Sequence, residues 1–236
     1  MLDIHPPEHT PHSWRDFFIH IATIVVGLLI AIGLEQTVEA VHRQHERTEL
    51  LQRLHEESQQ IVKECTQTKA VLVTRDQQIA SRIEQLQAVL WKHQTLAAGE
   101  PSRGPNVLQR PDDPIWRAAK TGGLAPRLTS EEIDAYSEVE IIAAKVEIAY
   151  DRLVVIHSDR TAFEHEFHGP DFDPDFSHAS PVDLRQYLHL LTQERTAVSY
   201  VDLMVAGMSG AEAIILKGSY DAREIRNSEQ NQQSTK

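Results

Sequence analysis

Hydrophobic and polar residues follow two contrasting patterns along the first hundred positions of the chain. From Phe17 to Leu34 the sequence reads FFIHIATIVVGLLIAIGL, which is 18 residues without a charged side chain. At the rise of an α-helix this run is about 27 Å long, close to the roughly 30 Å hydrocarbon core of a bilayer. The pattern predicts a transmembrane helix, because a helix in lipid satisfies its backbone groups within the segment.

The flanks of this run define the limits of the predicted anchor. Ser13 and Asp16 have the spacing of a capping box, and Trp14 stands where an interfacial aromatic residue belongs. We therefore place the anchor at residues 13–36, behind a disordered tail at residues 1–12 that is rich in Pro and His.

A cleaved signal peptide is the alternative interpretation of the same run. Val38 and Ala40 would satisfy the small-residue rule for cleavage. The apolar run is longer than the usual core of a signal peptide, however, and only Arg15 precedes it as a basic residue. These features favour an anchor that is retained.

One face of the predicted anchor carries small and polar residues. His20, Thr23, Gly27 and Ala31 follow one another at steps of three and four, so they share a stripe on a helix. Small residues at this spacing allow two helices to approach closely, and polar ones can hydrogen-bond across the contact. We hypothesise that this stripe mediates self-association; the alternative is that such residues occur by chance on a lipid-facing helix.

Residues 35–98 show the second pattern, a helix that is apolar along one stripe only. The segment contains neither Gly nor Pro and is rich in Glu, Gln, Leu, Lys and Arg. Steps of three and four define a heptad seam, made of Leu51, Leu54, Ser58, Ile61, Cys65, Thr68 and Leu72. Apolar residues resume at Ile79 in what we interpret as a shifted register, typical of a stutter or a helix break. Several seam positions are polar, which favours a bundle helix over a purely dimeric coiled coil.

Caps and loops divide the rest of the chain into further helices. Asp113 is expected to cap a short helix that begins at Pro114, and a capping box of Thr129 and Glu132 precedes a long helix at about residues 130–167. A second capping box with an N1 proline, SPVD at residues 180–183, begins another long helix. The pattern predicts an all-α fold, in which the anchor continues into a long helix that packs with two further long helices and a short one. We assign residues 37–226 to this helical bundle and residues 227–236 to a disordered polar tail.

Composition excludes some classes of partner. The chain has 236 residues and a formal net charge of −12, which argues against nucleic-acid binding because phosphate contacts require concentrated Lys and Arg. The single cysteine, Cys65, permits no internal disulfide, and we expect it to be a small buried residue. Only Arg15 precedes the anchor, whereas Arg43, Arg47 and Arg53 follow it, and the positive-inside rule weakly favours a cytoplasmic domain. Because long domains often translocate regardless of flanking charge, we assign no side of the membrane to the domain.

The candidate chemistry is concentrated near the predicted end of the second long helix. His165, His168, Asp171 and Asp173 could hold a metal ion, but they lack the spacing of zinc and calcium motifs, so we expect a solvated acidic loop instead. The chain has no nucleophile elbow, phosphate-binding glycine loop or CxxC pair. We therefore expect neither catalysis nor a cofactor.

Two segments carry a resemblance to a known family. The first is Phe17-Phe18 with the following IVVGLLIAI run and Leu50, Leu51 and Leu54; the second runs from Trp116 through Gly122-Gly123-Leu124 to Glu131. The chain resembles an uncharacterised bacterial domain-of-unknown-function family of single-pass membrane proteins with a helical soluble domain. The resemblance implies the architecture and no known activity.

These patterns support two functional hypotheses. The first is a membrane-anchored helical scaffold or protein-interaction module in the cell (inner) membrane, whose partners are the bilayer and a second copy bound through the anchor and the heptad seam. The second is a sensory or ligand-binding bundle tethered to the membrane, in which the loops at residues 98–113 and 168–180 gate a pocket. An apolar cavity with converging polar groups would favour it.

Overall fold

The computed structural model describes residues 14–92, 110–167 and 174–233, and these are helical throughout apart from turns and short connections. The elements in chain order are α1 (Trp14–Lys92), α2 (Pro114–Thr121), the 3-10 turn η1 (Ala125–Arg127), α3 (Ser130–His165), the 3-10 turn η2 (Phe176–His178), α4 (Pro181–Leu216) and α5 (Ala222–Gln233). Within the described residues no strand occurs, and the predicted all-α fold is confirmed.

The chain divides into two compact units, residues 1–49 and residues 50–236. Helix α1 contributes residues 14–49 to the first unit and residues 50–92 to the second. The first unit thus extends past the predicted end of the anchor at residue 36. Residues 1–13, which include Ser13 of the predicted capping box, lie outside the described residues.

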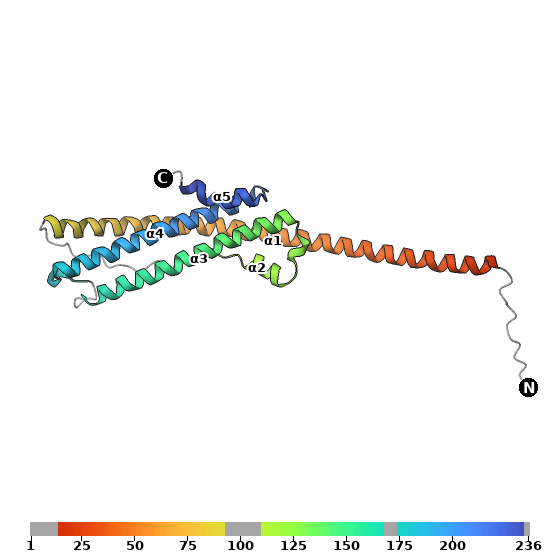
Figure 1. Cartoon of the computed structure of the whole chain (residues 1–236), viewed down its shortest axis with the longest axis horizontal. Helices are drawn as coiled ribbons and strands as arrows, with labels where there is room; N and C mark the ends of the chain where they lie inside the picture. Colours follow the sequence, from red (N-terminus) through yellow and green to blue (C-terminus); the bar gives the residue numbers. More distant parts are fainter. Residues whose placement is uncertain (1–13, 93–109, 168–173, 234–236) are drawn as a thin grey trace, which may run out of the picture. The chain divides into compact units, whose positions relative to one another are not determined.

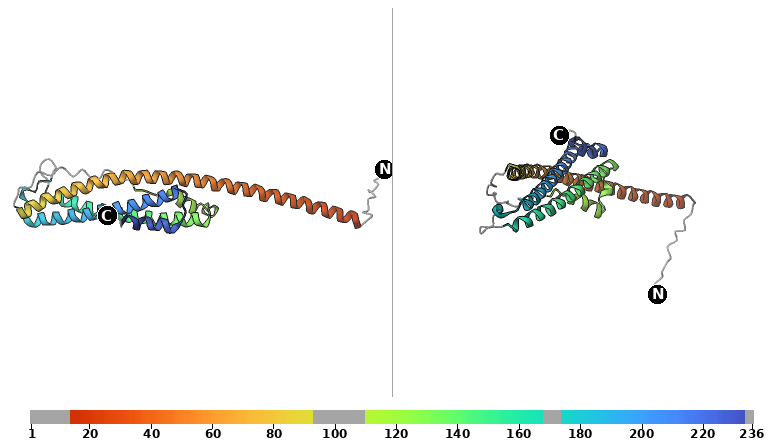
Figure 2. Two further views of the ribbon diagram at one scale, coloured as in Figure 1. Left: turned by 90° about the horizontal axis from the view of Figure 1, so that it is seen from above. Right: turned by 60° about the vertical axis from the view of Figure 1, so that its left-hand side comes forward.

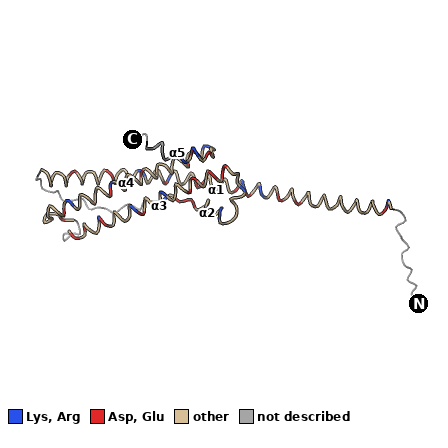
Figure 3. The backbone as a smooth tube through the Cα atoms, in the orientation of Figure 1, with Lys and Arg blue, Asp and Glu red and all other residues tan. Residues whose placement is uncertain are grey.

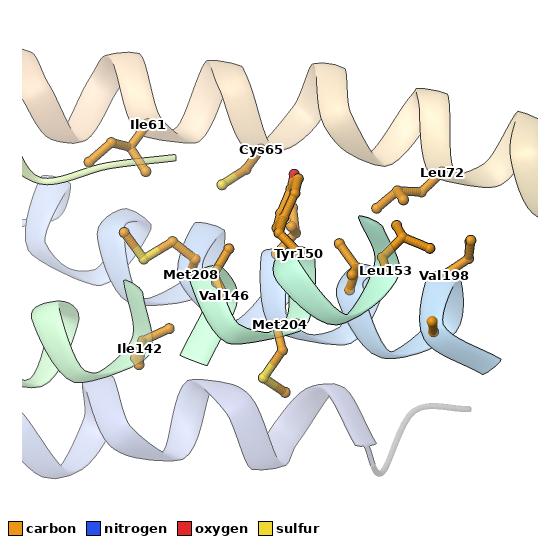
Figure 4. Close-up of a cluster of buried hydrophobic side chains, with 14 of the residues drawn as sticks. Ile61, Cys65, Leu72, Ile142, Val146, Tyr150, Leu153, Val198, Met204 and Met208 are labelled. Carbon is orange, nitrogen blue, oxygen red and sulfur yellow. The ribbon is translucent and has the colours of Figure 1, made fainter. Parts of the chain in front are cut away.

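The second unit is a helical bundle. Its part of α1 runs alongside α3 and α4, and α5 packs against α4 and α3 (Figures 1 and 2). Figure 4 shows side chains from all three long helices meeting in one core, where Tyr150 of α3 points toward α1 between Cys65 and Leu72. Cys65 is 1% exposed, which confirms the expectation of a small buried residue.

The heptad seam of α1 lies in this core. Leu54, Ser58, Ile61, Cys65, Thr68 and Leu72 are all buried. The predicted stutter beyond Leu72 is wrong, because α1 is continuous and the steps of three and four proceed through Arg75, Ile79, Arg82 and Leu86. Two arginines occupy seam positions, and this hid the continuity of the pattern.

Capping residues set the starts of the long helices. At α3, the backbone N–H of Thr129 donates to Glu132 Oε2 (2.8 Å) and that of Glu132 donates to Thr129 Oγ1 (3.3 Å). Ser180 and Asp183 make the same reciprocal pair at α4. The capping boxes predicted for α3 and α4 are therefore confirmed.

The short helix α2 is capped differently from the prediction. Asp113 occupies the N-cap position, but its side chain makes no capping hydrogen bond and pairs with Arg117 (Nε to Oδ1, 3.1 Å). Instead Glu57 of α1 accepts a hydrogen bond from the backbone N–H of Ile115 at 2.7 Å. A carboxylate from another helix therefore satisfies a free amide at the start of α2.

Helix α5 corrects the predicted disordered tail at residues 227–236. The helix continues to Gln233, and Ser228 is buried against α4, where its hydroxyl donates to the carbonyl of Gly207 at 3.1 Å. A Cβ atom at Gly210 would lie 3.3 Å from Ser228 Cβ, so glycine permits this close approach. Helix α4 continues through both glycines and ends before Gly218, whose φ of +80° is left-handed.

Candidate functional site

The first unit presents an apolar helix surface with no protein covering it. Every residue from 14 to 45 is exposed, and the large apolar side chains between Phe17 and Leu34 are 42–67% exposed. Figure 3 shows this stretch without a charged residue. Leaving such a side chain in water costs about 1.5–3 kcal/mol relative to burying it. The surface therefore requires an apolar environment along its whole circumference.

Two helices of the described chain are long and apolar enough to cross a membrane. One is the N-terminal part of α1, and the other is α4. Helix α4 buries half of its most apolar stretch in the bundle, and it also buries Glu194 and Glu212. These features identify α4 as a core helix of the second unit.

Aromatic residues lie at the N-terminal end of the apolar surface of α1. The Trp14 ring lies 5.8 Å from Phe17 and 5.7 Å from Phe18, measured between centroids, and all three side chains are exposed. Trp14 thus occupies the end of the apolar run, the position that interfacial aromatics take in membrane helices.

The predicted association stripe is open. His20 Nδ1 lies 2.8 Å from the backbone carbonyl oxygen of Asp16. The hydroxyl of Thr23 donates a hydrogen bond to the backbone carbonyl oxygen of Ile19, also at 2.8 Å. Each polar side chain is therefore satisfied by its own helix. A Cβ atom at Gly27 would have no other heavy atom within 4 Å, and Ala31 is exposed as well. The small residues therefore leave the helix surface open at Gly27 and Ala31.

Of the four candidate metal ligands, His165 alone lies among the described residues. His165 is the exposed last residue of α3, while the neighbouring Glu164 faces the core. His168, Asp171 and Asp173 lie outside the described residues. Across the part of the chain that the structure describes, no three His, Cys, Asp or Glu side chains are placed to hold a metal ion.

A buried ion network joins α1, α3 and α4 around Glu194, which is fully buried. Arg75 of α1 forms an ion pair with Glu194 Oε1, and Arg160 of α3 forms one with Oε2. Arg160 also pairs with Glu164, whose Oε1 accepts a hydrogen bond from the Tyr187 hydroxyl at 2.5 Å. Two guanidinium groups thus face two carboxylates.

His157 completes this network. Its Nδ1 lies 3.1 Å from Glu194 Oε1 and 2.6 Å from Arg75 Nη2. Burial alone would raise the pKa of Glu194, but the hydrogen bond with His157 and the charges of Arg160 and Arg75 lower it to about 2. The carboxylate therefore stays ionised inside the bundle and ties three helices together at one level.

A second cluster, made of Glu212, Glu57 and Asp113, is acidic; Asp113 pairs with Arg117, whereas Glu212 faces further carboxyl groups. Burial raises the pKa of Glu212 to about 7 against the hydrogen bond with Ser58, and Glu57 and Asp113 raise it further. Burial likewise raises the pKa of Glu57 to about 7. Glu212 Oε2 and Asp113 Oδ2 are buried without a hydrogen-bond partner among the described residues. Glu212 and Glu57 can therefore hold protons near neutral pH, whereas Glu194 cannot.

Neither buried cluster was predicted from the sequence. One signal was present: Arg75 and Arg82 replace apolar residues at seam positions one heptad apart. Arginine at a core-facing position needs a partner, and Arg75 finds Glu194, while the Arg82 guanidinium lies over the rings of Phe176 and Tyr187 at 5.7 and 5.9 Å. Glu194 and Glu212 themselves carry no such signal.

The structure also places a hollow on the first unit. It is an open depression on the exposed surface of α1, lined by Thr37, Ala40, Val41, Gln44, His45 and Thr48. The sensory hypothesis requires an enclosed cavity with converging polar groups, and this depression is not one.

The comparisons found no family model, curated protein or solved structure that matches this chain. The resemblance to a family of single-pass membrane proteins therefore stays a prediction.

Proposed function

We propose that this chain is a membrane-anchored helical interaction module, held in the cell (inner) membrane by a single span at residues 17–34. The observation that carries the proposal is the exposed surface of that segment, which is free of charge over 18 residues and apolar apart from His20 and Thr23. Lipid is the solvent that such a helix fits. The resemblance in sequence implies the same architecture.

The interior of the second unit supports a structural use of its polar groups. Arg75 and Arg160 are committed to Glu194 and Glu164 in the core, and Glu57 is committed to the start of α2. The heptad seam is likewise buried within the domain, so we do not include it among the surfaces for a second copy. The proposal accordingly assigns the domain a scaffolding role and no catalysis.

The first partner that we propose is a second copy, bound through the stripe of His20, Thr23, Gly27 and Ala31. Gly27 and Ala31 allow the two backbones to approach, and close packing is what drives helix association in lipid. Because His20 and Thr23 are satisfied within their own helix, we expect their contribution to be smaller than that of the small residues.

The test is the fraction of dimer formed by the full chain in phosphatidylcholine bilayers, measured by energy transfer between two labelled populations. Gly27→Leu and Ala31→Leu together should lower the dimer fraction at least threefold, since bulky side chains separate the helices. Gly33→Leu is the matched control, because Gly33 lies off the stripe and is equally open. An unchanged dimer fraction in the double variant, or an equal loss in the control, would remove the stripe from the proposal.

A further inference from the structure

Helix α3 carries an apolar row on its outward surface. Ile141, Ile148 and Val155 are 51%, 66% and 60% exposed, and they follow one another at steps of seven. Between them, at the intervening steps of three and four, stand Ala144 and Asp151, both exposed. These residues therefore occupy alternating a and d positions of a heptad pattern.

The core-facing residues of α3 occupy the opposite side of the helix. Val139, Ile142, Val146, Ala149 and Leu153 are buried and take the b and f positions of the same heptad. The domain consequently uses one face of α3 for its own core. The a and d face is left exposed, with β-branched residues at the a positions, which favour pairing of two helices.

Charges beside the row distinguish the two directions in which a second α3 could pair. Glu147 is at a g position and Arg152 is at the e position of the next heptad, and both are exposed. In a parallel pair, each g residue faces the e residue of the following heptad on the partner helix, so each Glu147 faces an Arg152. In an antiparallel pair g faces g and e faces e, which brings like charges together.

The polar layer of the row agrees with an in-register pair. Asp151 is at a d position and forms an ion pair with Arg110 of its own chain at 2.8 Å. Its negative charge is therefore compensated within the chain before a second copy binds. A single polar layer within an apolar seam fixes register at some expense of stability.

We infer that the outward face of α3 docks a second copy of this chain, α3 against α3, parallel and in register. Three apolar layers make a small interface, which binds weakly from free solution. Tethering two copies in one membrane raises their effective concentration to the millimolar range and brings them together with the same polarity. The inference therefore rests on the proposed membrane anchor.

Disulfide crosslinking of the full chain in phosphatidylcholine bilayers tests this inference. Ile141→Cys, Ile148→Cys and Val155→Cys should each give a disulfide-linked dimer under mild oxidation, because equivalent a positions meet in a parallel pair. Val182→Cys is the matched control, since it is an equally exposed apolar residue on α4. The native Cys65 is buried, so the unmodified chain gives the background.

The pattern of crosslinks separates the outcomes. Dimers from all three α3 positions and none from the control support the inference. An antiparallel pair sets a positions opposite d positions, so it would link Ala144→Cys chains with Val155→Cys chains while neither forms dimers alone, and this would overturn the parallel arrangement. No dimer at any α3 position, with the chain still in the membrane, would overturn the inference and leave the anchor standing. Loss of the chain from the membrane would instead contradict the proposed function.

A charge exchange gives a second readout that keeps the apolar row intact. Glu147→Arg or Arg152→Glu alone should lower the crosslinked fraction of Ile148→Cys roughly fivefold, because each replaces two attractive contacts with repulsive ones. Combining the two substitutions should restore it, since the opposite charges face each other again. Equal crosslinking in all four backgrounds would contradict the charge pairing on which the parallel direction depends.

Discussion

Helix α1 contains two segments that differ in how their apolar residues are arranged. Residues 17–34 are apolar on every side, and all of them are exposed in the first unit. Residues 50–92 are apolar along one seam, and that seam is buried in the second unit. The two segments therefore share a secondary structure and differ in the surroundings that they suit: an apolar surface of this extent suits lipid, whereas a single stripe suits packing against other helices.

The largest expected effect is that of a charge in the all-round apolar segment. Val26→Arg should cost about 3 kcal/mol or more of insertion free energy, because the guanidinium would lie near the bilayer centre. The measurement is the fraction of the chain that stays with membranes after alkaline carbonate extraction. Gln59→Arg, on the exposed face of the second segment, should leave that fraction unchanged. Equal retention of both variants would break the distinction between the two segments.

Removal of a leucine from each segment sharpens the same distinction. Leu54→Ala should lower the free energy of unfolding of the helical domain by about 3 kcal/mol, because Leu54 is fully buried and its loss leaves a cavity. Leu34→Ala is the matched change in the exposed segment, where Leu34 is 66% exposed. Urea unfolding followed by circular dichroism should show no change for Leu34→Ala. A similar loss of unfolding free energy in both variants would contradict the statement that only the seam is buried in the domain.

The ion network around Glu194 accommodates an arginine, Arg75, in the buried seam, and substitution of Glu194 tests how much this network stabilises the domain. The pKa of Glu194 is lowered to about 2 from an ordinary value of 4.5, so its stabilising contribution is present above pH 4.5 and is lost as the pH falls through 2. Glu194→Gln should therefore destabilise the domain by about 2 kcal/mol at pH 7, with a smaller loss at pH 3. Unfolding by urea at both pH values measures this. An equal loss at the two values would show that the carboxylate charge is not what stabilises the network.

The acidic cluster should respond to pH in the opposite direction, with the smallest effect. The pKa of Glu212 is raised to about 7 from 4.5, so the domain loses stability as the pH rises from about 4.5 through 7. Glu212→Gln mimics the neutral acid and should stabilise the domain by roughly 1–2 kcal/mol at pH 8. At pH 4 the variant and the original chain should unfold at the same urea concentration. Destabilisation at pH 8 would contradict the uncompensated burial of this carboxyl group.

The sequence predicted those parts of the fold that depend on local signals. The capping boxes at Thr129 and Ser180 located the starts of α3 and α4, and the spacing of Leu54, Ile61 and Leu72 located the buried seam. These signals work because they reside in neighbouring residues, whose contacts form within one or two helical turns.

Contacts between distant segments escaped prediction. Glu57 caps α2 from 58 residues away, and Arg75 pairs with Glu194 across 119 residues, so no local pattern joins them. The polar composition of residues 227–233 concealed the end of α5, which packs on the bundle through Ile225 and through Ser228 against Gly207. Pairing partners in a core depend on how helices are packed, which periodicity alone does not specify.

The most direct test of the membrane span is the labelling of single introduced cysteines in sealed membrane vesicles with an impermeant maleimide. The native Cys65 contributes little background, because burial raises the pKa of its thiol to about 12. Arg15→Cys and Val38→Cys should be labelled from opposite sides of the vesicle, and Val26→Cys should not be labelled until the membrane is dissolved. Labelling of both flanking positions from the same side, or of Val26→Cys as fast as the flanks, would contradict a span at residues 17–34.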